Sequence, residues 1–193
     1  MMVLKSKDDY TAILEKLKKE GNDINGTYEL VGKGLRTLPM TTKDIIDIFD
    51  LDKGILDGFV KAISNFEPTM VGPYITSKYF LLIPDLKEAV MQLNIDNLAS
   101  RRCVITFPKE HCFQSIQFLV RDNTIHVVCF MRSCDVVKNL PYDLWLCSFL
   151  ADMFAYYMEG LYDKEDVTAY TQHYITMSFG SLHVYKEDLK NVL

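Results

Sequence analysis

The sequence predicts an α+β domain in which a mixed, mostly antiparallel sheet packs on a central buried helix. Two observations carry this prediction. Residues 115–120 and 124–130 predict two strands joined around Asp122 and Asn123, which suits a tight β-hairpin. Residues 142–157 are apolar nearly all the way round the helix they would form, so we expect that helix to be central and buried.

Helical and strand patterns alternate along the first third of the chain. Apolar residues recur at helical spacing over residues 8–20, which predicts the first helix. The side chains of residues 27–31 alternate in polarity and the segment is flanked by glycines, which predicts a strand that ends in a turn or bulge. Thr41 and Asp44 have the spacing of a capping box and predict the start of the next helix. A further short helix is expected over residues 55–63.

The middle of the chain begins with an irregular stretch. Prolines and glycines interrupt residues 65–83, which predicts a loop of functional length. Pro84 then begins a helix with one apolar face, and residues 103–107 predict a strand. The last strand is expected over residues 170–179, and it leads through Gly180 to a short polar helix at the end of the chain.

The composition indicates one domain, residues 1–193, because a chain of this length with 49% hydrophobic residues can bury one core. The formal net charge of −5 argues against long nucleic acid as a partner, whereas a small phosphorylated ligand is compatible with it. The five cysteines form no CxxC pair, which favours reduced thiols in the cytoplasm over disulfides or a metal site. No stretch predicts a signal peptide or a membrane-spanning helix, so we expect no membrane partner.

Cys112 is a candidate nucleophile because of its place in the pattern. It follows the polar run KEH and precedes a predicted strand, and reactive groups are commonly displayed at such element ends. A nearby Arg132 would favour its thiolate. The alternative is a core cysteine, since most intracellular cysteines are small buried hydrophobes. A Cys/His hydrolase that uses His111 or His183 is a further alternative, but no oxyanion-hole signature accompanies it.

Two groups of basic residues are candidates for anion binding. Arg132 and Ser133 combine a fork of donors with a hydroxyl at the end of a predicted strand, which suits phosphate. The alternative for Arg132 is an ion pair with Asp135. Arg101 and Arg102 form a second basic pair, which on its own is an ordinary solvated dipeptide.

His183 and Tyr185 are candidates for contacts to a sugar. They are spaced by two, so in an extended segment their side chains point to the same side. Both can hydrogen-bond a hydroxyl group. The alternative for His183 is a surface histidine without a ligand.

Taken in chain order, these segments resemble the thymidylate synthase superfamily, and most closely its phage deoxycytidylate (dCMP) hydroxymethylase branch. The resemblance covers the C-terminal half best and implies a thymidylate synthase-like fold. It also implies, as one alternative for the origin of the chain, a phage-encoded enzyme in the host cytoplasm. The segments that carry it are SRR at 100–102, Cys112 with Gln117 five residues later, MRSCDVV at 131–137, Asp143, GSLHVY at 180–185 and, more faintly, LPMTTK at 38–43.

The resemblance implies a role for each matching residue. Cys112 would attack carbon 6 of a pyrimidine, so that carbon 5 can take a one-carbon unit from 5,10-methylenetetrahydrofolate. Arg132 and Ser133 would bind the phosphate, His183 and Tyr185 the ribose 3′-hydroxyl, and Arg101 and Arg102 the partner's phosphate in a homodimer. Gln117 would be a further substrate-binding residue. Asp135 would contact the folate pterin.

Asp143 occupies the position that selects the base in this family. Synthases that act on uracil carry an asparagine there, whose amide both donates and accepts. A carboxylate accepts from the exocyclic amine of cytosine and meets the carbonyl of uracil unfavourably, so buried polar groups are left unpaired by the wrong base. The resemblance therefore implies hydroxymethylation of dCMP or CMP, with water capturing the intermediate.

Several positions depart from the family pattern. The early phosphate-binding arginine aligns near Asn22, and the catalytic glutamate has no match, with Lys53 near it and Glu67 as the remaining candidate. The residue after the cysteine is Phe113 where synthases carry histidine, and the chain ends soon after Tyr185 without a long segment to cover the cofactor.

These departures leave two alternatives open. The first is a reduced family member that binds a pyrimidine nucleotide without turnover, as a sensor or as a partner of a larger assembly. The second is a dUMP-specific thymidylate synthase, which Asp143 disfavours.

Overall fold

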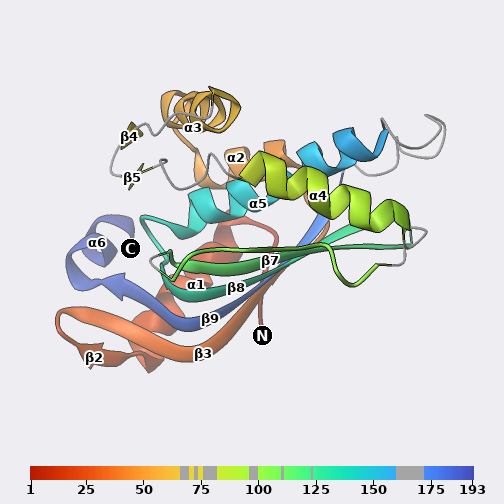
Figure 1. The fold of residues 1–193 in the computed structure, drawn as a ribbon. Helices are drawn as coiled ribbons and strands as arrows, with labels where there is room; N and C mark the ends of the chain where they lie inside the picture. Colours follow the sequence, from red (N-terminus) through yellow and green to blue (C-terminus); the bar gives the residue numbers. More distant parts are fainter. Residues whose placement is uncertain are drawn as a thin grey trace.

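The computed structural model describes residues 1–65, 70–71, 74–75, 82–95, 100–109, 111–122, 124–159 and 172–193. Within these residues the chain is a mixed α+β structure, which confirms the predicted class (Figure 1). The main sheet has the strand order β1-β3-β9-β8-β7-β6, with β2 paired to β3. Its ladders are antiparallel except for β1–β3 and β8–β9, so the sheet is mixed and mostly antiparallel, as expected.

The strands and helices have the following bounds. The main sheet consists of β1 (Met2–Leu4), β2 (Asn22–Ile24), β3 (Thr27–Thr37), β6 (Val104–Thr106), β7 (Phe113–Arg121), β8 (Thr124–Asp135) and β9 (His173–Tyr185). A separate pair is formed by β4 (Met70–Val71) and β5 (Tyr74–Ile75). The helices are α1 (Lys7–Glu20), α2 (Thr42–Phe49), α3 (Lys53–Asn65), α4 (Leu82–Ile95), α5 (Leu140–Glu159) and α6 (Lys186–Val192).

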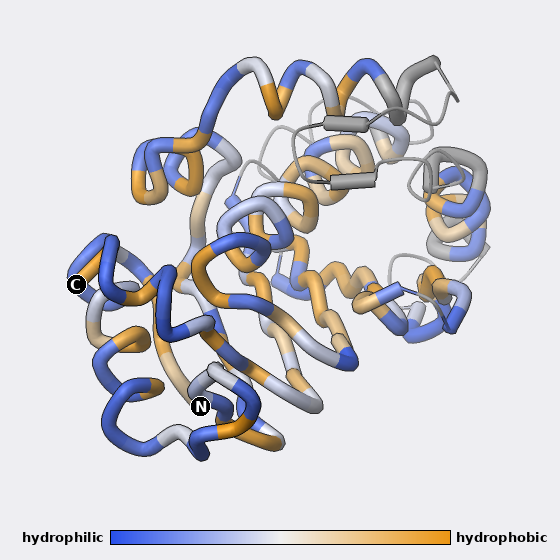
Figure 2. Tube along the Cα trace, turned by 90° about the vertical axis from the view of Figure 1, so that its left-hand side faces the viewer, coloured by the Kyte–Doolittle hydropathy of each residue, from blue (hydrophilic) through white to orange (hydrophobic). Residues whose placement is uncertain are grey.

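Helix α5 is the central helix that the apolar run predicts. Its residues Leu144, Leu150 and Phe154 are fully buried, and the ring of Phe154 stacks on Phe118 of β7 with 4.7 Å between centroids. Figure 1 shows α2, α4 and α5 on the same side of the sheet. In Figure 2 the hydrophobic stretches run along the strands and α5, whereas hydrophilic stretches predominate at the outer turns. No helix in the described ranges is both long and apolar enough to cross a bilayer.

The predicted helix starts are largely confirmed. Thr41 and Asp44 form the expected capping box, in which each side chain accepts from the other residue's backbone N–H. Helix α4 begins at Leu82, two residues earlier than predicted, and Pro84 lies in its first turn, where proline is tolerated because no backbone N–H is needed. Asp122 adopts φ +49° at the predicted hairpin turn, and Asn123 lies outside the described residues.

Three strands run further than the sequence predicts. Strand β3 continues beyond Gly32 to Thr37, β8 continues to Asp135, and β9 continues through Gly180 to Tyr185. Each is paired with a neighbour over the added stretch, and this pairing outweighs the local preference of glycine for a turn.

An irregularity crosses these three strands at one level. On β9 the buried residues are His173, Ile175, Met177 and Phe179 before Gly180, and Leu182 and Val184 after it, so the burial alternation changes phase. The same change occurs on β8 between Met131 and Cys134, and on β3 between Leu30 and Leu35. Because an extra residue in a strand reverses which face each side chain meets, we infer that a bulge-like step keeps one face of the sheet buried throughout.

Glycines make this step possible. Gly32 has φ +63°, a backbone conformation that is strained for a residue with a side chain. The β3–β9 ladder pairs the residues on either side of Gly32 and Gly180 but does not pair these two glycines. A Cβ on Gly180 would come within 2.7 Å of the Arg132 carbonyl oxygen. Arg132 and Ser133 therefore lie where regular strand geometry is interrupted, and the direction of their side chains could not be read from a two-residue period.

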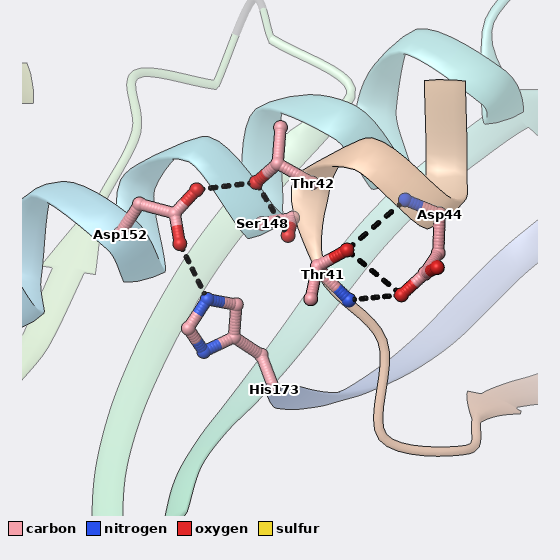
Figure 3. A network of polar contacts seen from close by, with 6 residues as sticks. All are labelled: Thr41, Thr42, Asp44, Ser148, Asp152 and His173. Atoms are coloured by element: carbon pink, nitrogen blue, oxygen red, sulfur yellow. Dashed lines mark hydrogen bonds and ion pairs between the residues drawn. The ribbon is translucent and has the colours of Figure 1, made fainter. Parts of the chain in front are cut away.

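A polar network ties α2, α5 and β9 together (Figure 3). The ring Nε2 of His173, which is fully buried, lies 2.8 Å from Asp152 Oδ1. Thr42 donates its hydroxyl to the other Asp152 oxygen and also lies 2.9 Å from Ser148 Oγ. Within the described residues, His173 Nδ1 is buried without a partner, so the proton is better placed on Nε2, where the carboxylate accepts it.

We expect Asp152→Ala to lower the free energy of unfolding by about 1–2 kcal/mol, because it leaves the buried Nε2–H group of His173 without an acceptor and removes one of the two partners of the Thr42 hydroxyl. Urea denaturation measures this effect. Asp47→Ala is the matched control, since Asp47 is an exposed acid of α2 that pairs with Lys43, and its loss should change stability by less than about 0.5 kcal/mol. Equal losses in the two variants would contradict a stabilising role for the network.

Candidate nucleophile and anion-binding site

Cys112 is held beside Arg132 and Ser133 by the start of the β7–β8 ladder. The backbone N–H of Arg132 donates to the Cys112 carbonyl oxygen at 2.7 Å. The Cys112 Sγ and Ser133 Oγ atoms are 3.6 Å apart, and Cys112 is half-buried. The predicted nucleophile and the predicted phosphate-binding residues are therefore brought together, although they are far apart in the sequence.

A β-bulge shapes the segment that carries Cys112. The ladder shifts register between Phe113 and Ser115, so Gln114 is the extra residue. The Gln114 amide donates to the carbonyl oxygens of His111 at 2.8 Å and Phe113 at 3.2 Å. These hydrogen bonds fix the turn that precedes β7 and hence the position of the thiol.

Arg132 is exposed and does not pair with Asp135. Its Nη1 donates to the Lys109 carbonyl oxygen at 3.2 Å, and this is its only side-chain hydrogen bond within the described residues. Asp135 is only 4% exposed, and its Oδ1 accepts from the backbone N–H groups of Val137 and Lys138 at 2.9 and 3.1 Å. The ion-pair alternative for Arg132 is thus not observed, and its guanidinium can meet an anion from solvent.

Asp143 lies in the first turn of α5, and its backbone N–H donates to the Asn139 carbonyl oxygen at 2.9 Å. Burial raises the pKa of its carboxyl to about 7, and a hydrogen bond from the Cys134 thiol to Oδ2, at 3.6 Å, opposes this rise. Since Ser133 and Cys134 are consecutive on β8, neighbouring residues contact Cys112 and Asp143.

His183 and Tyr185 end β9 next to this part of β8. The parallel β8–β9 ladder pairs Asp135 with His183. The rings of His183 and Tyr185 have centroids 5.9 Å apart at 82°, which confirms that the two side chains lie on the same side. The Lys138 ammonium lies 4.8 Å over the Tyr185 ring.

Arg101, Arg102 and Gln117 are not brought to Cys112 within one chain. Gln117 donates its amide to the Arg101 carbonyl oxygen at 2.7 Å, and both arginines are exposed. The backbone of Phe118 bonds to Cys103, just after the arginine pair, and the six residues of strand from Cys112 to Phe118 span about 20 Å. The other candidate acid, Glu67, lies outside the described residues.

Two contacts escaped the sequence reasoning. Gln114 matched no pattern, because a bulge has no clear sequence signal. Cys134 lies inside the segment MRSCDVV, where only its neighbours were assigned a role. Its proximity to Asp143 depends on how β8 packs against α5, and no local pattern encodes that packing.

The arrangement has a definite chemical capacity. It combines a half-buried thiol, a hydroxyl, an exposed guanidinium and a half-buried carboxylate on adjoining ends of β7, β8 and α5. Such a set can add a nucleophile to a ligand that also carries an anionic group and a hydrogen-bond donor.

Among the described residues, no cluster of three histidine, cysteine or acidic side chains could hold a metal ion. Comparisons with models of known protein families and with curated proteins found no match to this chain.

Proposed function

We propose that the chain is a pyrimidine-nucleotide hydroxymethyltransferase, which transfers a one-carbon unit from methylenetetrahydrofolate to carbon 5 of dCMP or CMP. One observation carries the proposal. Ser133 and Cys134 are consecutive on β8 and contact Cys112 and Asp143 respectively, so the nucleophile and the base-selecting acid flank an anion-binding fork. The resemblance to the deoxycytidylate hydroxymethylase branch assigns these same positions those roles.

In the proposed reaction the Cys112 thiolate adds to carbon 6 of the pyrimidine, which makes carbon 5 nucleophilic. The ionised Asp143 accepts a hydrogen bond from the 4-amino group of cytosine. Arg132 and Ser133 hold the phosphate, and His183 and Tyr185 hold the ribose. The co-substrate supplies the one-carbon unit at carbon 5. Loss of the carbon 5 proton then expels tetrahydrofolate and leaves an exocyclic methylene. Water adds to this methylene, and the Cys112 thiolate leaves carbon 6.

A second candidate function is nucleotide binding without turnover, as a sensor or a partner of another protein. The observation that favours it is the environment of Asp135, the residue that the resemblance assigns to the folate pterin. Its side chain is buried, and one of its oxygens already accepts two backbone N–H groups. The geometry therefore supports the nucleotide part of the proposal better than the folate part.

Two measurements on the wild-type protein separate these candidates. Thermal-shift titration with dCMP, CMP and dUMP reports binding, because a ligand that binds only the folded state raises the melting temperature. Release of tritium from carbon 5 of labelled dCMP, with methylenetetrahydrofolate present, reports turnover. Stabilisation by dCMP with tritium release supports the enzyme, and stabilisation without release supports the binding protein. Preference for dUMP would favour a thymidylate synthase, and no response to any nucleotide would exclude all three.

We also propose that two copies of the chain associate through the face of the sheet opposite α2, α4 and α5, which we call the open face. Val104, Gln117, Val128 and Thr176 are register partners across this face, and so are Ser115 and Phe130 in the next row. Phe130 and Val104 are 50% and 42% exposed. A second copy would cover these side chains. It would also place the exposed Arg101 and Arg102 near the anion-binding site of the second copy, since the site at their own Cys112 is out of reach.

Phe130→Glu should convert a dimer into a monomer, because it places a charge in the centre of the proposed interface. Size-exclusion chromatography with light scattering measures the mass directly. Met91→Glu is the control, since Met91 is 57% exposed on α4, on the other side of the sheet, and its replacement should leave the mass unchanged. A wild-type monomer at all concentrations would contradict the proposed association.

A further inference from the structure

The thiol of Cys134 has an unusual environment for a buried cysteine. Its side chain is on β8, 1% exposed, and its Sγ lies 3.6 Å from Asp143 Oδ2 and 3.7 Å from the Asp135 carbonyl oxygen. Burial, and then the neighbouring acid Asp143, raise the pKa of this thiol well above its usual value. It is therefore a neutral S–H group that can donate but does not act as a nucleophile near neutral pH.

The contact distinguishes the two oxygens of Asp143. Within the described residues, Cys134 is the only side chain that hydrogen-bonds this carboxylate, and it uses Oδ2 alone. Oδ1 accepts no hydrogen bond from a described residue and is not fully buried, so it remains accessible to a ligand. A carboxylate held at one oxygen can present the other to a ligand in a fixed direction.

We propose that Cys134 is a positioning residue, which holds Asp143 Oδ2 so that Oδ1 accepts from the 4-amino group of a cytosine nucleotide. This inference rests on the proposed function, and it adds a specificity-determining residue that does not itself touch the nucleotide. A donor at Oδ2 also stabilises the charged carboxylate, which is the form that accepts from cytosine. A protonated Asp143 could instead donate to the carbonyl of uracil.

The thiols that face Asp143 in the described structure are few. They are Cys134 from β8 and Cys147 from the next turn of α5, and Cys134 in turn interacts with the thiol of Cys112. Burial raises the pKa of Cys147 well above its usual value as well. Neither buried thiol titrates near neutral pH, so a change in nucleotide preference in that range reports Asp143.

The test compares Cys134→Ala, Cys134→Ser and the control Cys129→Ala by titration with dCMP and dUMP from pH 5.5 to 8.5. Cys129 is a buried cysteine of β8 whose sulfur contacts Cys147 at 3.3 Å, so its replacement leaves a similar cavity without removing a donor from Asp143. We expect Cys134→Ala to lose about three- to tenfold of the dCMP preference over dUMP. Its dCMP binding should also begin to weaken at a higher pH than in the wild type. Cys134→Ser keeps a donor and should recover part of both effects.

A measurement without nucleotide tests the contact between Cys134 and Asp143 separately from the proposed function. The ¹³C shift of the Asp143 carboxyl, followed against pH, should report a higher pKa in Cys134→Ala than in the wild type and no change in Cys129→Ala. If all variants titrate alike and keep the same preference, the positioning role of Cys134 is wrong. If Cys134→Ala shifts the carboxyl titration while no protein binds a nucleotide, the contact is real but the proposed function fails, and with it the role in specificity.

Discussion

Replacing Cys112 with alanine should reduce tritium release from carbon 5 of dCMP by at least about a thousandfold, because no other group supplies the nucleophile. Binding of dCMP should change by less than about threefold, since the phosphate and base contacts remain. Cys112 lies 3.6 Å from the Ser133 hydroxyl, so removal of the thiol leaves the hydroxyl and Arg132 free to hold the phosphate. Isothermal titration of the variant alongside the tritium assay separates binding from chemistry.

Two further variants test whether the loss of turnover is specific to the Cys112 thiol. Cys112→Ser keeps the size of the side chain but offers a much weaker nucleophile, so it should also lose turnover. Cys103→Ala removes a fully buried cysteine about 20 Å away along the sheet, and it should keep both binding and turnover. Turnover in Cys112→Ala near the wild-type rate would contradict covalent catalysis by this residue. Loss of binding in the same variant would indicate that the thiol serves the fold instead of the reaction.

The parts of the fold predicted best are those set by local chemistry. The capping box of Thr41 and Asp44 needs only two side chains at the right spacing, and it formed as expected. The burial of α5 follows from its apolar composition. The length of β9 was missed because Gly180, alone in the sequence, indicates a turn, whereas in the structure it provides the close approach to the Arg132 carbonyl that the sheet requires.

The same distinction between local chemistry and long-range packing applies to the candidate site. Cys112, Arg132 and Ser133 were singled out from their places at element ends, and the ladder between β7 and β8 brings them together. The neighbour of Asp143 could not be predicted, because the contact with Cys134 depends on the phase change that crosses the sheet at Gly180. Predictions from a two-residue period fail wherever several strands change phase together.

Replacing Asp143 with asparagine should reverse the base preference from dCMP to dUMP, with a combined change in relative affinity of about a hundredfold or more. The carboxylate only accepts, whereas the amide can donate to the uracil carbonyl and accept from its N3–H group. Titration of both nucleotides against the wild type and Asp143→Asn measures the reversal. Asp47→Asn, on the exposed surface of α2, should leave the preference unchanged. A variant that still prefers dCMP would remove Asp143 from the role of base selector.

The dependence on pH provides a second test of the same residue. Burial raises the pKa of the Asp143 carboxyl to about 7, so the accepting carboxylate is lost as pH falls through that value. Wild-type affinity for dCMP should therefore weaken from pH 8 to pH 6 more steeply than the affinity of Asp143→Asn for dUMP, which keeps only the pH dependence that both complexes share, such as the second ionisation of the phosphate. Stability supplies an independent sign. The folded carboxyl binds its proton more tightly than the unfolded one, so wild-type stability should fall as pH rises from about 4 to 7, and Asp143→Asn should abolish that part of the slope. Identical slopes in urea unfolding of the two proteins would mean that Asp143 ionises as freely in the folded chain as in the unfolded one, and the pH-dependent selection of cytosine would then lose its physical basis.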